Sequence, residues 1–263
     1  YESSLYHKHP GRPVLKVDAG DWVRGRLDLV PLDALKTRYL LRAMHALGYD
    51  AINVGLNDVQ NPPDFFESMR EAHPGVLDAL VSANIFLKSE PEKTYFPPWR
   101  IVERELEDGS KVRIGITGLT SINRNARESN QSLELGEYLL KDPVETLKAV
   151  VRELRPQVDV LVVLHTGIIP GELQLLVDAA PEVDFLVTTS NLANPAAMIL
   201  RSGQTYMLST PNNLGKEVGI LSLKPGDEGR WQTAAMPTSL YVSLDLPVDE
   251  EMVALIEAFK QET

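Results

Sequence analysis

Short apolar runs that alternate with amphipathic helical segments constrain the fold of this chain more than any other feature. The run VDVLVVL at 158–164 is continuous rather than alternating, which is typical of a strand buried on both faces. Strands of the same kind are predicted over 14–19, 51–54, 79–85 and 183–188. Helices are predicted over 31–50, from 63–64 onward, and over 142–156, 170–182 and 248–261. The alternation predicts an α/β fold built on a largely parallel sheet covered on both faces.

The remaining stretches add antiparallel structure to this plan. Alternating residues on both sides of Asp108-Gly109 predict a β-hairpin across 101–119. After residue 200 the pattern favours strands, which we expect near the carboxyl end of the sheet. The stretch 120–137 is predicted to be a surface loop. Neither a repeat nor a linker interrupts the pattern, so we expect a single domain over 1–263.

Composition excludes several classes of function. The 263 residues carry a formal charge of −11, which opposes binding to a nucleic-acid backbone or to an anionic membrane surface. The absence of cysteine excludes disulfides, zinc–thiolate sites and thiol catalysis within these residues. Apolar runs stay well short of the roughly 20 residues of a membrane span. We therefore expect neither nucleic acid nor a membrane span among its interactions.

Polar side chains gather at the predicted carboxyl ends of the strands, where open α/β sheets bind their ligands. Gly20-Asp21 follows the first strand, and Gly55-Leu56-Asn57-Asp58 follows the second. His165 and the stretch 188–192 follow two later strands. Aspartate, histidine and asparagine supply the oxygen and nitrogen donors that divalent metals prefer. These strand ends therefore indicate the position of a site.

The order of these strand ends resembles the calcineurin-like metallophosphoesterases, and among them the catalytic domain of the periplasmic 5′-nucleotidases. The family pattern is D-x-H, then G-D, G-N-H-[ED], a lone histidine after a strand, and G-H-x-H. Stretches 40–55, 110–121 and 142–167 resemble the family as well. The resemblance implies a layered sheet sandwich flanked by helices. It also implies two divalent metal ions that clamp a phosphate and activate a water molecule.

The ligand set implied by that resemblance is largely missing here. Asp21 matches the carboxylate that bridges both metals, and His165 matches the lone histidine. Leu56 replaces a ligand asparagine, and a leucine side chain has no lone pair to donate. Asn57 replaces the histidine that protonates the leaving group. The D-x-H strand is absent, because the sequence begins just before the second motif.

The last motif is degenerate too, since Ser190 and Leu192 replace its two histidines. The resemblance therefore predicts a vestigial site with no catalytic residue and no cofactor, in which Asp21 and His165 are the remaining metal candidates. The vestigial site comprises Asp21, Asn57, Asp58, His165, Ser190 and Asn191.

Each of these residues also has a plain structural interpretation. Asp21 would cap a turn, and His165 would be a hydrogen-bonded, partly buried histidine. Without metals the Asp21 carboxylate must be exposed, protonated or hydrogen-bonded. We expect hydrogen bonds, donated by backbone amides or by the side chains of the same cluster, with His165 within reach. The expected side-chain donors are Asn57, Thr188, Ser190 and Asn191.

Three functions follow from the resemblance. The first is a non-catalytic binding or structural module in the periplasm or elsewhere outside the cytoplasm, with a protein partner such as a multihaem cytochrome. The second is an active phosphoesterase with two metal ions and a shell rebuilt from Asp21, Asn57, Asp58 and His165. The third is a small-molecule sensor that uses Thr188, Ser190 and Asn191. A signal peptide is not visible, since the sequence starts at Tyr1.

Overall fold

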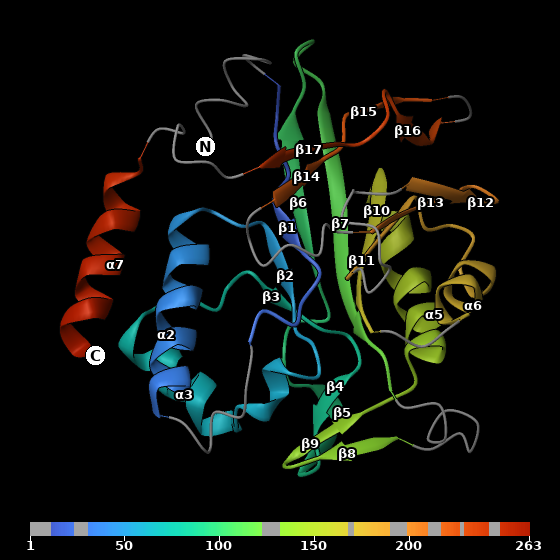
Figure 1. The fold of residues 1–263 in the computed structure, drawn as a ribbon. Coiled ribbons are helices and arrows are strands. Elements are labelled where there is room, and N and C mark those ends of the chain that lie inside the picture. Colours follow the sequence, from blue (N-terminus) through green and yellow to red (C-terminus); the bar gives the residue numbers. More distant parts are fainter. Residues whose placement is uncertain are drawn as a thin grey trace.

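The computed structural model of the chain describes residues 12–23, 31–122, 132–167, 171–189, 199–209, 217–226, 229–241 and 248–263. Two central sheets lie between helices α2 and α3 on one side and α5 and α6 on the other (Figure 1). This arrangement confirms the predicted α/β class and the layered sheet sandwich flanked by helices. The helices are α2 (Pro31–Ala46), α3 (Pro63–Ala72), α5 (Pro143–Leu154), α6 (Glu172–Ala179) and α7 (Glu250–Glu262), with short 3-10 turns η1 (Asp58–Gln60) and η2 (Arg155–Gln157).

The larger central sheet has six strands in the order β12-β13-β11-β10-β7-β6. Its four inner strands are mutually parallel, and its two edge strands run antiparallel to their neighbours. The smaller central sheet, in the order β1-β2-β3, is parallel throughout. The strands are β6 (Trp99–Glu105), β7 (Lys111–Thr120), β10 (Val160–Thr166), β11 (Phe185–Thr188), β12 (Ile199–Ser202) and β13 (Thr205–Ser209), and β1 (Val17–Asp18), β2 (Ala51–Asn53) and β3 (Leu80–Val81).

Three small sheets complete the described fold. One of them has four strands in the order β5-β4-β9-β8, and two pairs, β14-β17 and β15-β16, follow late in the chain. The antiparallel pairing of the late strands confirms what their sequence predicts. The strands are β4 (Ile85–Leu87), β5 (Glu90–Thr94), β8 (Leu133–Leu135), β9 (Tyr138–Leu140), β14 (Glu217–Ile220), β15 (Leu223–Pro225), β16 (Trp231–Thr233) and β17 (Thr238–Tyr241).

Apolar side chains fill three layers around the two central sheets. One cluster lies between the small sheet and helices α2 and α3, and a second lies between the large sheet and helices α5 and α6. A third cluster joins the sheets face to face, with Ala51 and Val81 of the small sheet against Ile116 and Val162 of the large one. Within the described ranges, no helix has both the length and the apolar character that crossing a membrane requires.

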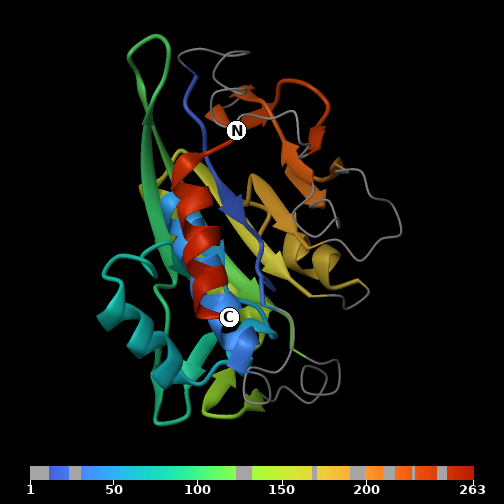
Figure 2. The same ribbon diagram turned by 60° about the vertical axis from the view of Figure 1, so that its left-hand side comes forward.

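The predicted local elements are mostly present. β10 is buried along its whole length, which confirms the interpretation of 158–164 as a central strand. The hairpin β6–β7 turns at Asp108-Gly109 as predicted and projects beyond the sheet (Figure 2). Gly109 has a φ of +80° there, a conformation that favours glycine. Local signals were therefore reliable wherever periodicity or turn chemistry was strong.

The predicted residue ranges of two strands and one loop were wrong. The stretch 79–85 is two strands in different sheets, β3 and β4, because the chain changes sheet at 82–84. There the side chain of Asn84 hydrogen-bonds to Thr120 of β7 and to Lys141, which follows β9. The first strand is only half-buried and short, because it forms an edge of the small sheet. The stretch 120–137 is not a loop throughout, since β8 lies within it, while 123–131 falls outside the described residues.

Candidate functional site

The carboxyl ends of β1 and β2 bring Asp21 and Asn57 together. These strands pair in parallel, so both ends lie at the same edge of the small sheet. Oδ1 of Asp21 accepts a hydrogen bond from the backbone N–H of Asn57 at 3.1 Å. A Cβ at Gly55 would collide with the Asp21 carboxylate, so glycine is required for this close approach. The expected backbone hydrogen bond to Asp21 is thus present.

Asp58 ties the loop after β1 to the loop after β2. Its carboxylate is fully buried and accepts three backbone N–H groups, from Gly55 at 2.7 Å and from Asp21 and Val23 at 2.9 Å each. Burial raises the pKa of this carboxyl well above its ordinary value, and the three donors offset part of that effect. Asp21 adopts a φ of +60°, and the hydrogen bond from its N–H to Asp58 helps to hold it there.

Asp18 adds a third carboxylate to this edge. Its Oδ1 accepts a hydrogen bond from the N–H of Gly20 at 2.8 Å. Burial raises the pKa of Asp18 to about 6, and the neighbouring charge of Asp21 acts in the same direction. Asp18 is not among the site residues that the sequence predicts. Its signal was a second carboxylate three residues before Asp21, at the end of the same predicted strand.

His165 lies in a separate buried cluster at the end of β10. Its Nδ1 is 3.1 Å from Oγ1 of Thr188, and its Nε2 is 3.1 Å from both Oγ of Ser121 and Oε2 of Glu172. The hydroxyl of Ser121 also donates to Glu172. His165 is 1% exposed and Glu172 is 0% exposed, so solvent does not reach these groups. We call these four residues the His165 cluster.

The structure thus divides the predicted site residues. Asp21, Asn57 and Asp58 come together, whereas no hydrogen bond among the described residues joins His165 to Asp21. Ser190 and Asn191 lie outside the described residues. Ser121 and Glu172 are not among the site residues that the sequence predicts. Neither has a motif, although Glu172 is an acidic residue seven positions after His165 in the predicted 170–182 helix.

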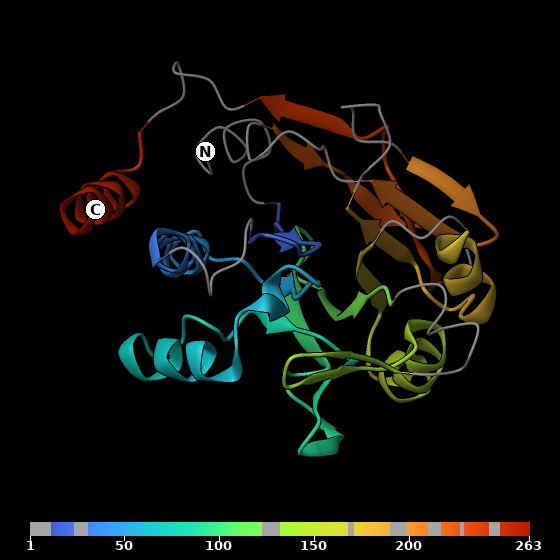
Figure 3. The ribbon, with the colours of Figure 1, turned by 60° about the horizontal axis from the view of Figure 1, so that its bottom comes forward.

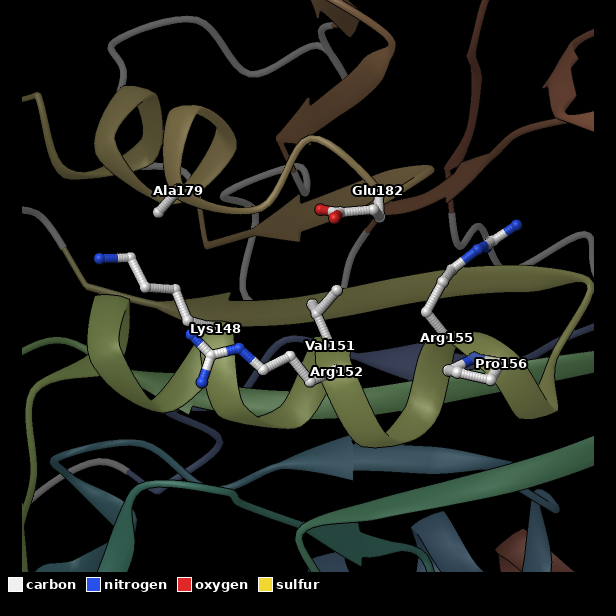
Figure 4. Close-up of a pocket in the computed structure, with 7 residues that line it drawn as sticks. All are labelled: Lys148, Val151, Arg152, Arg155, Pro156, Ala179 and Glu182. Atoms are coloured by element: carbon white, nitrogen blue, oxygen red, sulfur yellow. The ribbon is translucent and has the colours of Figure 1, made fainter.

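A hollow of about 460 Å³ lies beside α5, away from the carboxyl ends of the strands where the site residues lie (Figure 4). Arg155 and Glu182 line it, and they precede β10 and β11, so the hollow lies near the opposite ends of those strands. Two of its three cations are already paired: Arg155 with the buried Asp184 at 2.6 Å, and Lys148 with Glu145 at 2.7 Å. Its charge is therefore largely neutralised within the protein.

Comparison with solved structures decides the fold. Calcineurin-like phosphoesterase YfkN from Bacillus subtilis aligns with a TM-score of 0.69 at 19% identity, over 99% of this chain and 87% of that one. The chain has the calcineurin-like phosphoesterase fold. NAD nucleotidase NadN from Haemophilus influenzae aligns with the same TM-score, 0.69, at 17% identity over 99% of this chain and 52% of that one.

Sequence comparison points the same way. Protein UshA from Salmonella pullorum is 24% identical over 204 residues, which are 72% of this chain and 35% of that protein. The chain therefore spans about a third of the length of this relative. No protein-family profile matches the chain. The resemblance to 5′-nucleotidases seen in the motifs is thus supported by both sequence and fold.

The residues present do not fit the metal pair that this phosphoesterase fold implies. Within the described ranges, no group of three or more histidine, aspartate or glutamate side chains is placed to hold a metal ion. Both oxygens of Asp58 and both ring nitrogens of His165 already have hydrogen-bond partners in the protein. Leu56 packs against the apolar cluster of the small sheet. The stretch 190–198 contains no histidine or acidic residue.

Proposed function

We propose that this chain is a non-catalytic 5′-nucleotidase-like domain that serves as a binding or structural module. The observation that carries the proposal is the hydrogen bonding of the residues at the metal-ligand positions. Asp21 accepts the N–H of Asn57, and His165 is enclosed by Ser121, Thr188 and Glu172. In this proposal these hydrogen bonds join the strand ends, and bound cations are not needed there.

The His165 cluster opposes metal binding for a chemical reason. A histidine binds a metal through a ring nitrogen that carries a lone pair and no proton. Nε2 of His165 lies 3.1 Å from a carboxylate oxygen of Glu172 and 3.1 Å from the hydroxyl of Ser121, so this nitrogen is already engaged within the protein. Loading a metal there would break buried hydrogen bonds and leave the carboxylate of Glu172 without its imidazole partner. Retention of this histidine therefore does not indicate retention of a metal.

Location and partner follow from the resemblance alone and belong to the same proposal. We place the domain outside the cytoplasm, as the likeness to periplasmic 5′-nucleotidases suggests. Its partner in this proposal is another protein of that compartment, and a multihaem cytochrome is the specific case. The formal charge of −11 favours a partner with a basic surface.

Elemental analysis combined with an activity assay tests the loss of catalysis. The chain is purified, incubated with Mn²⁺, Zn²⁺ or Fe²⁺, desalted and analysed for metal. The same samples are assayed with a nucleotide and with p-nitrophenyl phosphate, beside the Asp21→Asn variant. We expect no stoichiometric metal and no hydrolysis that distinguishes parent from variant. Two metal ions per chain, with hydrolysis that Asp21→Asn abolishes, would instead establish an active phosphoesterase.

A further inference from the structure

Glu172 is a charged residue that the fold encloses completely. It is the first residue of α6, which lies with α5 on one face of the large central sheet (Figure 3). Glutamate is almost never fully buried unless it is paired. The side chain of Glu172 is nevertheless 0% exposed, and it reaches from α6 to the ends of β7 and β10. A charge buried in this way needs partners that offset its desolvation.

The partners of Glu172 meet at one ring nitrogen of His165. Oε2 of Glu172 is 3.1 Å from Nε2 of His165, and it also accepts a hydrogen bond from the hydroxyl of Ser121. That hydroxyl is itself 3.1 Å from Nε2. The other ring nitrogen, Nδ1, faces Oγ1 of Thr188 at 3.1 Å. A metal ion binds histidine about 2.0–2.1 Å from a ring nitrogen, so an ion here would have to displace these groups or take them as ligands.

Gly167 closes the cluster where the chain leaves β10. A Cβ at this position would collide with the side chain of Ser121, and the φ of +150° at Gly167 disfavours any other residue. The backbone after β10 therefore lies in contact with Ser121. His165 is 1% exposed and Ser121 is 3% exposed. The histidine thus lies in a closed space that protein groups occupy.

We infer that the protein closes the metal position beside His165 with its own groups, and that the carboxylate of Glu172 holds the imidazole in place of a cation. The inference rests on the proposed non-catalytic function and adds to it the residue responsible for the closure. The alternative is an ion bound jointly by His165 and Glu172. Among the described residues no third histidine, aspartate or glutamate completes a metal site with this pair, so that ion would lack the ligands that divalent metals require.

A double-mutant cycle measured by urea unfolding in EDTA tests whether Glu172 and His165 act as a pair. Its variants are Glu172→Met, His165→Leu and the two combined. Each single substitution is expected to raise the equilibrium constant of unfolding at least about tenfold, because it leaves a buried polar group without its partner. The double variant removes both polar groups, so its effect is expected to be at least about tenfold smaller than the product of the single effects.

The matched control is Glu182→Met, because Glu182 is an exposed glutamate that follows α6. It is expected to change stability little and to show no coupling with His165→Leu. Circular dichroism checks that each variant is folded. Glu172→Gln, which keeps an oxygen and loses the charge, replaces Glu172→Met in the cycle if the latter does not fold. Independent effects of the substitutions at 172 and 165 overturn the inference, whereas the proposed function stands if the parent still binds no metal.

Thermal unfolding with and without Mn²⁺ or Zn²⁺ distinguishes the carboxylate from a metal ion. We expect the parent to have the same melting temperature with either ion as with EDTA. A melting temperature that an ion raises in the parent, and in neither Glu172→Met nor His165→Leu, means that both residues are metal ligands and overturns the inference. Hydrolysis of a nucleotide by the ion-loaded parent overturns the proposed function as well.

Discussion

At the scale of single residues, Asp58 shows how one buried carboxylate can organise two loops. Its two oxygens accept hydrogen bonds from backbone N–H groups in the loop after β1 and in the loop after β2. A buried carboxylate is costly, and hydrogen bonds from backbone amides reduce that cost. The backbone conformation of Asp21 therefore depends on a side chain 37 positions later in the sequence.

We predict that Asp58→Ala lowers the free energy of unfolding by about 3 kcal/mol or more, because it leaves three backbone N–H groups without their acceptor. Asp58→Asn keeps one side-chain oxygen and has a smaller effect. Urea unfolding followed by circular dichroism measures both changes. Asp78→Ala is the control, because Asp78 is exposed. Equal stability of the Asp58→Ala and Asp78→Ala variants would contradict this account.

At the scale of elements, two buried asparagines connect the sheets. Asn53 on β2 donates to the backbone carbonyls of Ala19 and Leu119, which joins the small central sheet to β7. Asn84 donates to the carbonyls of Thr120 and Lys141 and accepts the N–H of Thr120. Each asparagine thus satisfies backbone groups at places where one sheet meets another.

Asn84 offers the sharper test of these connections. We predict that Asn84→Ala costs about 2–4 kcal/mol, because three hydrogen bonds to buried backbone groups are lost. Asn84→Asp is expected to be at least as damaging, since a carboxylate cannot donate to two carbonyls. The exposed Asn57→Ala serves as the control in thermal unfolding. A melting temperature for Asn84→Ala within a degree of that control would refute the role.

At the scale of the whole molecule, acidity sets how stability depends on pH. The chain carries a formal charge of −11 at pH 7, and the buried Asp58 and the half-buried Asp18 both have raised pKa values. A carboxyl whose pKa is raised on folding binds its proton more tightly in the folded state than in the unfolded state. Its contribution to stability is therefore present at low pH and is lost as pH rises through the folded pKa.

We predict that the part of the pH dependence due to Asp18 lies between about pH 4 and pH 6, the interval between its ordinary and its raised pKa. Over that interval the free energy of unfolding should fall with rising pH more steeply for the parent than for Asp18→Asn. Asparagine keeps an oxygen for the N–H of Gly20 but does not titrate. Urea unfolding at several pH values measures both slopes. Parallel curves would show that Asp18 does not titrate as its burial requires.

Sequence by itself determined the elements whose signals are local. The continuous apolar run of β10, the turn at Asp108-Gly109 and the periodic segment that forms α5 were all predicted from neighbouring residues. The position of Asp21 shortly after a strand was likewise predicted from the residues. So were Leu56 and the stretch 190–192 as positions where this sequence departs from the family pattern that it resembles. Such features depend on side-chain spacing and backbone preference within a few residues.

Only the tertiary structure decided which distant residues meet. The division of 79–85 between two sheets depends on Asn84 reaching Thr120 and Lys141, which lie 36 and 57 positions later in the sequence. The His165 cluster includes Ser121 from another strand and Glu172 from a helix. The contact between α2 and α7 joins residues more than two hundred positions apart. These contacts arise because packing satisfies buried polar groups with partners that lie close in space, and no local pattern specifies which partners those are.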